Sequence, residues 1–290
     1  MKVRSLLYII LASVFWGSSA IFFKLLTPFG FQPIHLTAMR GIVSAIAIIL
    51  YALITNRTLF KASIKELVLF VSSGIAVFLT AFFYYASISY SSVSVAVMLM
   101  YTAPVFVAAY SVAFLGEKLT RSKIVSIVLV IVGCALVSGI LNGVAYSLTG
   151  IAFGLLSGIM YSSYNIIARI AMMNKSNSLS ATLYCFTTMG IISLFAGDIG
   201  GITQIACADF AVTLPLMIGI GICTCVIPYF LYTLALRYIP AGTASAIGIL
   251  EPISATVFSV AFFNEKLTLS GFCGIIFVLF AVFILSRTDQ

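Results

Sequence analysis

Residues 111–120 read SVAFLGEKLT, and residues 259–268 read SVAFFNEKLT. Eight of the ten positions are identical at a fixed offset of 148 residues (265 − 117) in a chain of 290 residues. The offset is about half the chain length, and each copy closes a long apolar run. The repeat therefore predicts one structural unit that occurs twice, an arrangement common among polytopic membrane proteins.

Composition restricts the chain to the membrane-protein class. Hydrophobic residues make up 62% of the chain and charged residues only 8%, with a mean hydropathy of +1.23. A soluble protein of this size needs far more polar residues to cover its surface. We therefore predict an all-α, polytopic membrane protein without a soluble domain. Ten transmembrane helices are expected, at about residues 5–26, 34–55, 66–89, 93–115, 122–141, 149–172, 179–197, 211–236, 241–263 and 268–286.

The ten apolar runs divide into two sets of five. We place the first repeat at residues 1–143 and the second at residues 144–290. Between Glu117 and Glu265 the predicted chain crosses the bilayer five times, an odd number, so the two copies face opposite ways. The sequence thus predicts inverted-topology repeats, whose halves can rock about a site near the membrane midplane.

The N-terminus, with a basic start and the apolar run LLYIILASVF, also fits a signal peptide cleaved near Ser19 or Ala20. The repeat argues against this alternative. Three serines of the first helix match three of the sixth at an offset of 144 (157 − 13): Ser13, Ser18 and Ser19 align with Ser157, Ser162 and Ser163. The first helix is therefore predicted to belong to the duplicated unit and to be retained.

The basic residues predict how the chain is oriented. With the N-terminus inside, twelve of them fall on the cytoplasmic side: Lys2, Arg4, Arg57, Lys61, Lys65, Lys118, Arg121, Lys123, Arg169, Lys175, Arg237 and Arg287. Lys24 and Lys266 fall outside, and Arg40 lies within a span. This positive-inside bias predicts a multi-pass protein of the plasma (inner) membrane with both termini cytoplasmic. The net charge of +8 reflects this topology and an anionic inner leaflet, so we expect the lipid bilayer and no nucleic acid as partner.

The residue pattern argues against enzymatic and metal chemistry. The six cysteines lack zinc or disulfide spacing, and Cys223-Thr-Cys225 fits small-residue packing better than a pair of soft ligands. The single histidine, His35, is expected as a satisfied surface residue at the outer mouth of the second helix. An enzyme would need a nucleophile, a metal set or an acid–base pair at one depth. We therefore predict no enzymatic activity, no metal and no cofactor.

Glu251 is the strongest functional candidate, because polar groups at membrane depth are costly and usually have a role. It lies ten residues (251 − 241) into its predicted span, near the midplane. Pro252 follows directly and leaves the Gly248 carbonyl without its helical donor, which predicts a kink. Pro104 is the matching proline of the first copy, but Ala103 stands where the acid would be. Both copies therefore have the proline, but only the second has the acid. This difference favours a functional role for Glu251 over a buried structural one.

Arg40 is the second candidate, about six residues in from the outer end of its helix. One interpretation is that its side chain snorkels to the lipid headgroups. The other is that it points inward, toward a cavity shared with Glu251. The two residues would then differ in depth by roughly 9 Å, a gap that a small zwitterion can fill. In that orientation one site offers both a cation and an anion.

Aromatic and polar side chains at predicted membrane depth extend the candidate site. Each alone is as well explained by packing or by an interface belt, but together they predict an aromatic-walled cavity suited to organic cations or ring-bearing solutes. The predicted substrate-binding or coupling residues are Glu251, Arg40, Trp16, Tyr84, Tyr101, Tyr161, Asn165 and Tyr229.

Short motifs along the whole chain carry a resemblance to a known family. They are Phe15-Trp16-Gly17-Ser18-Ser19, Met39-Arg40-Gly41, Leu250-Glu251-Pro252, and Gly116-Glu117-Lys118-Leu119-Thr120 with its echo Asn264-Glu265-Lys266-Leu267-Thr268. In these motifs the chain resembles the EamA family of the drug/metabolite transporter superfamily, with ten spans in two five-helix units. The resemblance implies a secondary transporter of the inner membrane, in a family rich in exporters of amino acids and other small metabolites. Asn264 departs from the glycine of the first copy, which affects only an outer turn.

The candidate site favours one class of substrate over another. A lone midplane acid with an inward arginine fits a small amphoteric solute, whose amine or coupling proton binds Glu251 and whose carboxylate binds Arg40. The alternative is an organic-cation carrier, in which Glu251 and the tyrosines hold an ammonium group while Arg40 faces the headgroups. A non-transporting membrane subunit is a further alternative. Because both halves lie in one chain, a monomer suffices, and a homodimer is also open.

Overall fold

The computed structural model describes residues 2–103, 105–106, 109–110, 120–137, 147–174, 176–236, 250–264 and 268–288. Over these residues the chain is helical, without a β-strand, as the all-α prediction requires. Six of the described helices are long and apolar enough to cross a membrane, and shorter apolar helices accompany them.

The described helices agree with the predicted spans to within a few residues at most ends. In the first half they are α1 (Lys2–Gly17), α2 (Ser19–Leu26), α3 (Pro33–Thr55), α4 (Ile64–Tyr90), α5 (Val93–Met100) and α7 (Arg121–Val137). In the second half they are α8 (Leu148–Met173), α9 (Ser178–Ala196), α10 (Ile199–Ala208), α11 (Phe210–Gly221), α12 (Ile227–Leu236), α14 (Leu250–Phe263) and α15 (Leu269–Thr288). A single π-helical turn, Ile222–Val226, joins α11 to α12.

Local polar residues explain where several of these helices begin. The Ser63 hydroxyl accepts a hydrogen bond from the Glu66 amide, and the Glu66 carboxylate accepts one from the Ser63 amide, a capping box that starts α4. Asn177 caps α9 by accepting from the first amides of the helix, and Ser92 caps α5 by accepting from Val95 N. Apolar spans therefore start at polar caps, where the chain leaves the membrane.

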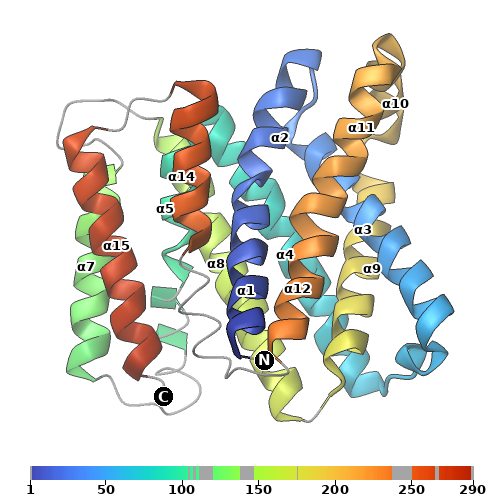
Figure 1. Ribbon diagram of the computed structural model, residues 1–290, viewed down its shortest axis with the longest axis horizontal. Coiled ribbons are helices and arrows are strands. Elements are labelled where there is room, and N and C mark those ends of the chain that lie inside the picture. The colour runs from blue at the N-terminus through green and yellow to red at the C-terminus, as the bar shows by residue number, and fades with distance from the viewer. Residues whose placement is uncertain are drawn as a thin grey trace.

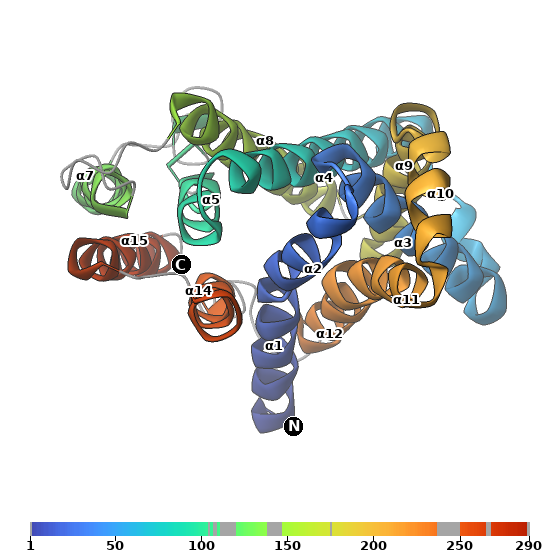
Figure 2. The same ribbon diagram turned by 90° about the horizontal axis from the view of Figure 1, so that it is seen from above.

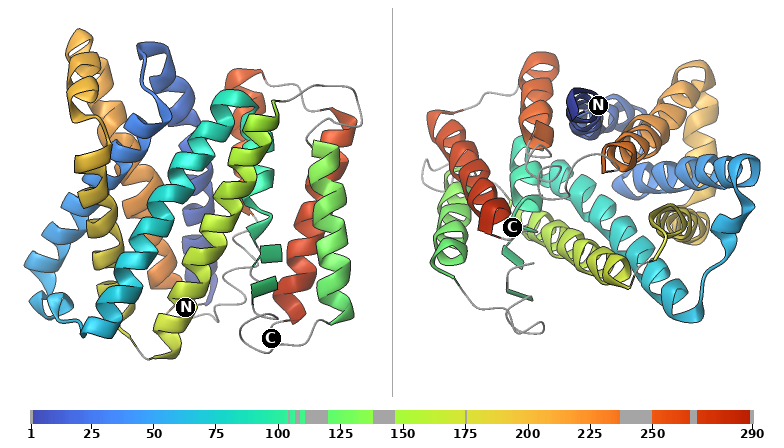
Figure 3. Two further views of the ribbon diagram at one scale, coloured as in Figure 1. Left: turned by 180° about the vertical axis from the view of Figure 1, so that it is seen from behind. Right: turned by 60° about the horizontal axis from the view of Figure 1, so that its bottom comes forward.

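The two halves run in opposite directions. The start of α1 and the end of α15 lie at the same end of the bundle, whereas α8 begins at the opposite end and runs antiparallel to α1 (Figures 1 and 3). This is the arrangement expected of inverted copies. The predicted boundary between the copies falls among residues 138–146, outside the described residues, so the division at 143 and 144 stays a prediction.

The most extensive packing joins one half to the other, with α4 packed along α8. α3 packs against α9, and α7 packs against α15 beside the main bundle (Figure 2). The contact of α1 with α12 corresponds to the contact of α4 with α8, with the two halves exchanged. α5 meets α14 near the centre.

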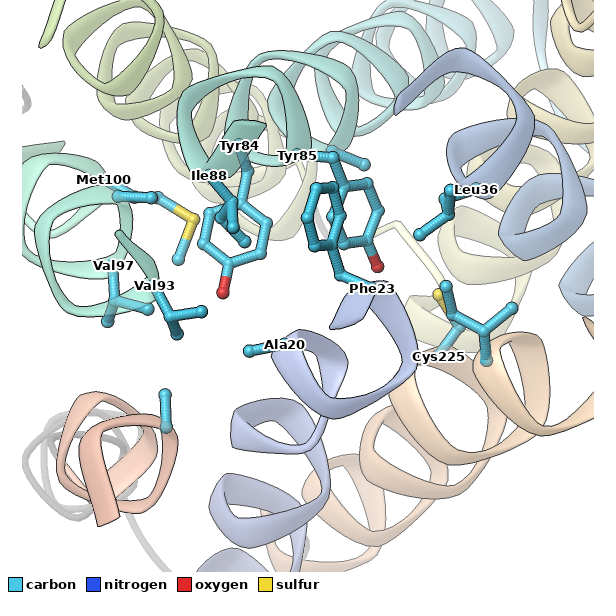
Figure 4. Packing of buried hydrophobic residues seen from close by; sticks show 14 of the residues in the cluster. Ala20, Phe23, Leu36, Tyr84, Tyr85, Ile88, Val93, Val97, Met100 and Cys225 are labelled. Carbon is cyan, nitrogen blue, oxygen red and sulfur yellow. The ribbon is translucent and has the colours of Figure 1, made fainter. Parts of the chain in front are cut away.

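The hydrophobic core draws on most of the described helices, and one part of it lies between α2, α4 and α5. Phe23 and Tyr85 stack with ring centroids 5.7 Å apart, and both rings are buried. The neighbouring Tyr84 points from α4 toward the side of Val97 and Met100 rather than onto Phe23 (Figure 4). Two adjacent tyrosines of one helix therefore have different neighbours within the core.

The crossing of α3 and α9 depends on glycine. A Cβ atom on Gly41 would meet the Ser193 hydroxyl and would lie 3.0 Å from the Met189 carbonyl oxygen. Because backbone cannot yield as a flexible side chain can, we expect Gly41→Ala to lower the free energy of unfolding by about 1–3 kcal/mol. Thermal unfolding of the purified protein should show Tm lower by roughly 2–10 °C. The matched control is Gly200→Ala in α10, where the added Cβ has only Asp198 Oδ1 at 3.9 Å. An unchanged Tm in Gly41→Ala would contradict the tight crossing.

The two predicted proline kinks lie partly outside the described residues. Pro104 lies outside the described residues, but α5 ends at Met100, and Tyr101 and Thr102 form a turn. Pro252 lies in the described part of α14, two residues after its first described residue, Leu250. Gly248, whose carbonyl the kink should free, is among the residues that are not described. Both kinks stay predictions.

The structure places a helix between the predicted spans 179–197 and 211–236, and it corrects the prediction for His35. Residues 199–208 form the helix α10. His35 is buried, at 5% exposure, rather than on the surface. Its Nε2 lies 3.2 Å from Asp198 Oδ2, and its Nδ1 accepts a hydrogen bond from the Gln32 amide at 3.1 Å. The histidine is satisfied, as predicted, but it joins α3 to the start of α10.

Asp198 gives this contact a pH dependence. The Gly201 amide, first, and the His35 side chain, second, hold the pKa of Asp198 below its usual range. A lowered pKa in the folded state stabilises the protein above the unfolded value of about 3.9. This contribution is lost as the pH falls through the folded value. We therefore expect Tm to fall less steeply in Asp198→Asn than in wild type when the pH is lowered from about 5 to about 3. Asp209→Asn is the control, because Asp209 makes no side-chain capping bond, and equal slopes in wild type and Asp198→Asn would contradict the assignment.

Candidate functional site

A cavity lies among α1, α3, α4, α8, α12 and α14, with further walls from α2 and α5. Its space accessible to water is about 60 Å³, enough for roughly four water molecules. Its lining consists of Trp16, Ser19, Arg40, Val77, Thr80, Ala81, Tyr84, Met100, Tyr161, Tyr229 and Glu251. Six of the eight residues predicted from the sequence are among them, although they come from six different helices.

Glu251 lines the cavity from α14. Its Oε2 accepts a hydrogen bond of 2.8 Å from the Tyr101 hydroxyl. Tyr101 itself is buried and lies in the turn after α5, the helix that meets α14 from the other half of the chain. The Glu251 carboxylate, in the second half of the chain, is thus held by a tyrosine of the first half.

Arg40 lines the same cavity and does not extend toward the end of its helix. Its Nε donates to the Cys225 sulfur at 2.8 Å, and its Nη2 donates to the Thr224 carbonyl oxygen at 3.1 Å. Both partners lie in the π-helical turn between α11 and α12. Of the two orientations open from the sequence, the structure has the inward one.

No salt bridge joins Arg40 to Glu251, although both side chains line one cavity. Within the described ranges the ion pair that the structure shows is instead His35 with Asp198, at the end of the bundle. The guanidinium and the carboxylate therefore face a shared space without neutralising each other in direct contact. Such an arrangement can bind an anionic and a cationic group of one small solute.

Aromatic rings form one wall of the cavity. Trp16 packs edge-on against Tyr229, with centroids 5.3 Å apart at 83°, and Tyr229 packs edge-on against Phe186 at 4.9 Å. Tyr161 stacks with Tyr164 at 6.4 Å. Because edge-to-face and stacked pairs fix ring orientation, the wall presents defined aromatic surfaces to the cavity.

The other predicted residues stand next to the cavity. Tyr101 is the hydrogen-bond partner of Glu251, and Asn165 lies beside the Tyr161 side chain. Ser157 is fully buried and donates to the Thr80 carbonyl oxygen at 3.2 Å, so it serves the packing of α8 on α4.

The sequence did not point to several residues of the site. Val77, Thr80, Ala81 and Met100 are ordinary residues of apolar helices, and no local pattern marks them as lining residues. Cys225 was assigned to packing, yet it contacts Arg40. A proline four residues after Thr224 is the signal that marks this turn as special.

Metal ligands are not grouped in the described ranges, where no set of three or more His, Cys, Asp or Glu side chains converges. The described lining offers one carboxylate, one guanidinium and several hydroxyls, groups that can bind a small polar solute.

Comparison with known proteins identifies the family of the chain. The model of the family described as "EamA-like transporter family" matches residues 3–139 and 148–287. A Bacillus subtilis protein described as "Uncharacterized transporter YwfM" is 25% identical over 288 residues, covering 98% of this chain and 94% of its own. An uncharacterized transporter of Archaeoglobus fulgidus is 28% identical over 223 residues, covering 74% of this chain and 75% of its own.

A solved crystal structure has the same fold. It superposes with a TM-score of 0.63 over 100% of both chains, at 13% sequence identity. At this identity the likeness speaks for the fold alone.

Proposed function

This chain belongs to the EamA-like transporter family of membrane transporters, and on that premise we propose that it carries small zwitterionic metabolites, with amino acids as the favoured class. In this proposal Arg40 binds the carboxylate of the solute, and Glu251 binds its ammonium group or a coupling proton. The observation that carries the proposal is that both charges line one cavity without forming an ion pair with each other.

The size of the cavity supports a small solute. Its water-accessible space of about 60 Å³ is far below the 300–1,000 Å³ typical of sites for drug-sized ligands. A compact solute with a charge at each end fills such a space and brings a partner to each charged side chain. A bulky organic cation would need a much larger opening and would leave Arg40 without an anion.

The organic-cation carrier remains the second candidate function. Trp16, Tyr161 and Tyr229 present aromatic faces beside Glu251, and such faces attract ammonium groups. This candidate, however, required Arg40 to face the headgroups, whereas its guanidinium contacts Thr224 and Cys225. An arginine that lines the same cavity as a cation-binding site would oppose binding by charge repulsion, so the zwitterion is favoured.

The proposed mechanism is alternating access between two inverted halves. Helices α1 and α14 approach closely at Gly17, where an added Cβ would lie 2.8 Å from the Ser254 Cβ. Helices α5 and α8 approach closely at Gly158, where an added Cβ would lie 2.7 Å from the Thr102 hydroxyl oxygen. These are corresponding helices of the two halves, and each contact borders the cavity. In the proposal the two contacts part in turn and open the site to opposite faces of the membrane.

The transport would be secondary, driven by a proton passing through Glu251 or by the gradient of the solute itself. We place the carrier in the plasma (inner) membrane with both termini cytoplasmic, on the strength of the basic residues, and we favour export. The site lies within one chain, so a monomer is sufficient for the cycle, and a homodimer is compatible with it.

Counterflow tests the proposed function. Proteoliposomes loaded with an unlabelled amino acid should accumulate the same amino acid in labelled form, and protein-free liposomes should not. A panel of amino acids, their decarboxylated amines and quaternary ammonium compounds, each with and without an imposed pH gradient, assigns the substrate class and the coupling. Accumulation of quaternary ammonium compounds without accumulation of any amino acid would replace the first candidate by the second.

A further inference from the structure

The carbonyl group of Thr224 lacks the donor that an α-helix would give it. In a regular helix the amide of residue 228 donates to this oxygen, but residue 228 is proline and has no amide hydrogen. The chain here also forms a π-helical turn, Ile222–Val226, which ends with the Ile227 amide donating to the Ile222 oxygen five residues back. The Thr224 oxygen is therefore available to accept a hydrogen bond from a donor on another helix.

Arg40 of α3 is the donor that reaches it. Its Nη2 lies 3.1 Å from the Thr224 oxygen, and its Nε lies 2.8 Å from the Cys225 sulfur. Cys225 is fully buried, so its sulfur is fixed within the packed bundle. Two adjacent acceptors thus hold one edge of the planar guanidinium, and a planar group held at two points has a fixed orientation.

The Arg40 guanidinium has further N–H groups besides the two that bind Thr224 and Cys225. A guanidinium has five N–H groups, and these two contacts use two of them. Arg40 also lines the cavity, and the Tyr85 side chain is close to it. A carboxylate binds a guanidinium best through two parallel hydrogen bonds, which demands a correctly oriented edge.

We infer that Pro228 and Cys225 are positioning residues, which hold Arg40 so that it presents one edge to the carboxylate of a solute in the cavity. This inference rests on the proposed function and adds to it a specificity for carboxylate-bearing solutes. Pro228 has no amide hydrogen to compete with Arg40 for the Thr224 oxygen. The Cys225 sulfur accepts the second hydrogen bond from Arg40. Neither residue lines the cavity.

The test measures KM and the maximal rate of counterflow for an amino acid and for its decarboxylated amine. Pro228→Ala returns an amide that competes for the Thr224 oxygen, and Cys225→Ala removes the second acceptor. Each should raise KM for the amino acid about tenfold, equal to about 1.4 kcal/mol, with a smaller change in maximal rate and no rise for the amine. Cys225→Ser restores an acceptor and should return KM to within about threefold of wild type.

Pro215→Ala is the matched control, because Pro215 is an exposed proline inside α11 of the same span, away from Arg40. It should leave both KM values unchanged. Arg40→Ala, assayed alongside, separates the two proposals. If Arg40→Ala raises KM for the amino acid while Pro228→Ala and Cys225→Ala do not, the positioning inference fails and the proposed function stands. If Arg40→Ala leaves that KM unchanged, both fail.

Discussion

Glu251→Gln is expected to reduce counterflow of the substrate by about 10- to 100-fold, because a hydrogen bond to a charged group contributes about 1.5–3 kcal/mol. The substitution keeps the shape of the side chain and leaves an oxygen that can accept from Tyr101. It removes the negative charge that binds an ammonium group or a coupling proton. Under an imposed pH gradient the variant should also lose any acceleration that the wild type shows.

Glu66→Gln is the matched control for this acid. Glu66 lies at the start of α4, in a capping box with Ser63, and glutamine preserves such a box. Its counterflow should equal that of the wild type. Full activity in Glu251→Gln, with both proteins equally stable, would make Glu251 a structural residue and remove the centre of the proposed site.

Arg40→Ala should have an effect of the same size, but only on solutes that carry a carboxylate. Loss of the guanidinium removes the partner of that carboxylate, a charge-assisted contact, so counterflow of the amino acid should fall by about 10- to 100-fold. The decarboxylated amine should be carried as well as before or better, because the positive charge beside it is gone. The readout is the ratio of the two rates, which is insensitive to the amount of active protein.

Two further variants test the specificity of this effect. Arg57→Ala removes an exposed arginine from a loop helix and should change neither rate. Arg40→Lys keeps the charge, but an ammonium group lacks the planar pair of donors that binds the Thr224 oxygen and the Cys225 sulfur together. It should recover only part of the amino-acid rate, and full recovery would show that charge alone suffices.

Helix boundaries were predictable because long apolar runs and polar caps are local features. Spans such as α3 and α4 end within a few residues of their predicted limits. The helix α10 was missed because its sequence opens with Gly200 and Gly201, which suggest a loop. Asp198, in a left-handed conformation with φ 48°, caps that helix, and Ile202 and Ala206 are buried against the core. Packing, rather than propensity, makes this segment helical.

The charged residues of the site were predictable for a different reason. Arg40 and Glu251 are charged residues within predicted spans, where the cost of a charge in lipid indicates a functional role. The apolar and hydroxyl-bearing members, such as Thr80 and Met100, carry no such mark. Their place in the cavity follows only from the packing of α4 and α5 against the other half. The link from Pro228 through Thr224 to Arg40 spans three helical segments and needed the structure.

The most direct test of the central claim is the ratio of counterflow rates for one amino acid and its decarboxylated amine, measured in wild type and in Arg40→Ala. If one cavity binds both charges of a zwitterion, the wild type should favour the amino acid and Arg40→Ala should favour the amine. A wild type that carries the amine but not the amino acid, with the same rates in Arg40→Ala, would contradict the account and identify an organic-cation carrier.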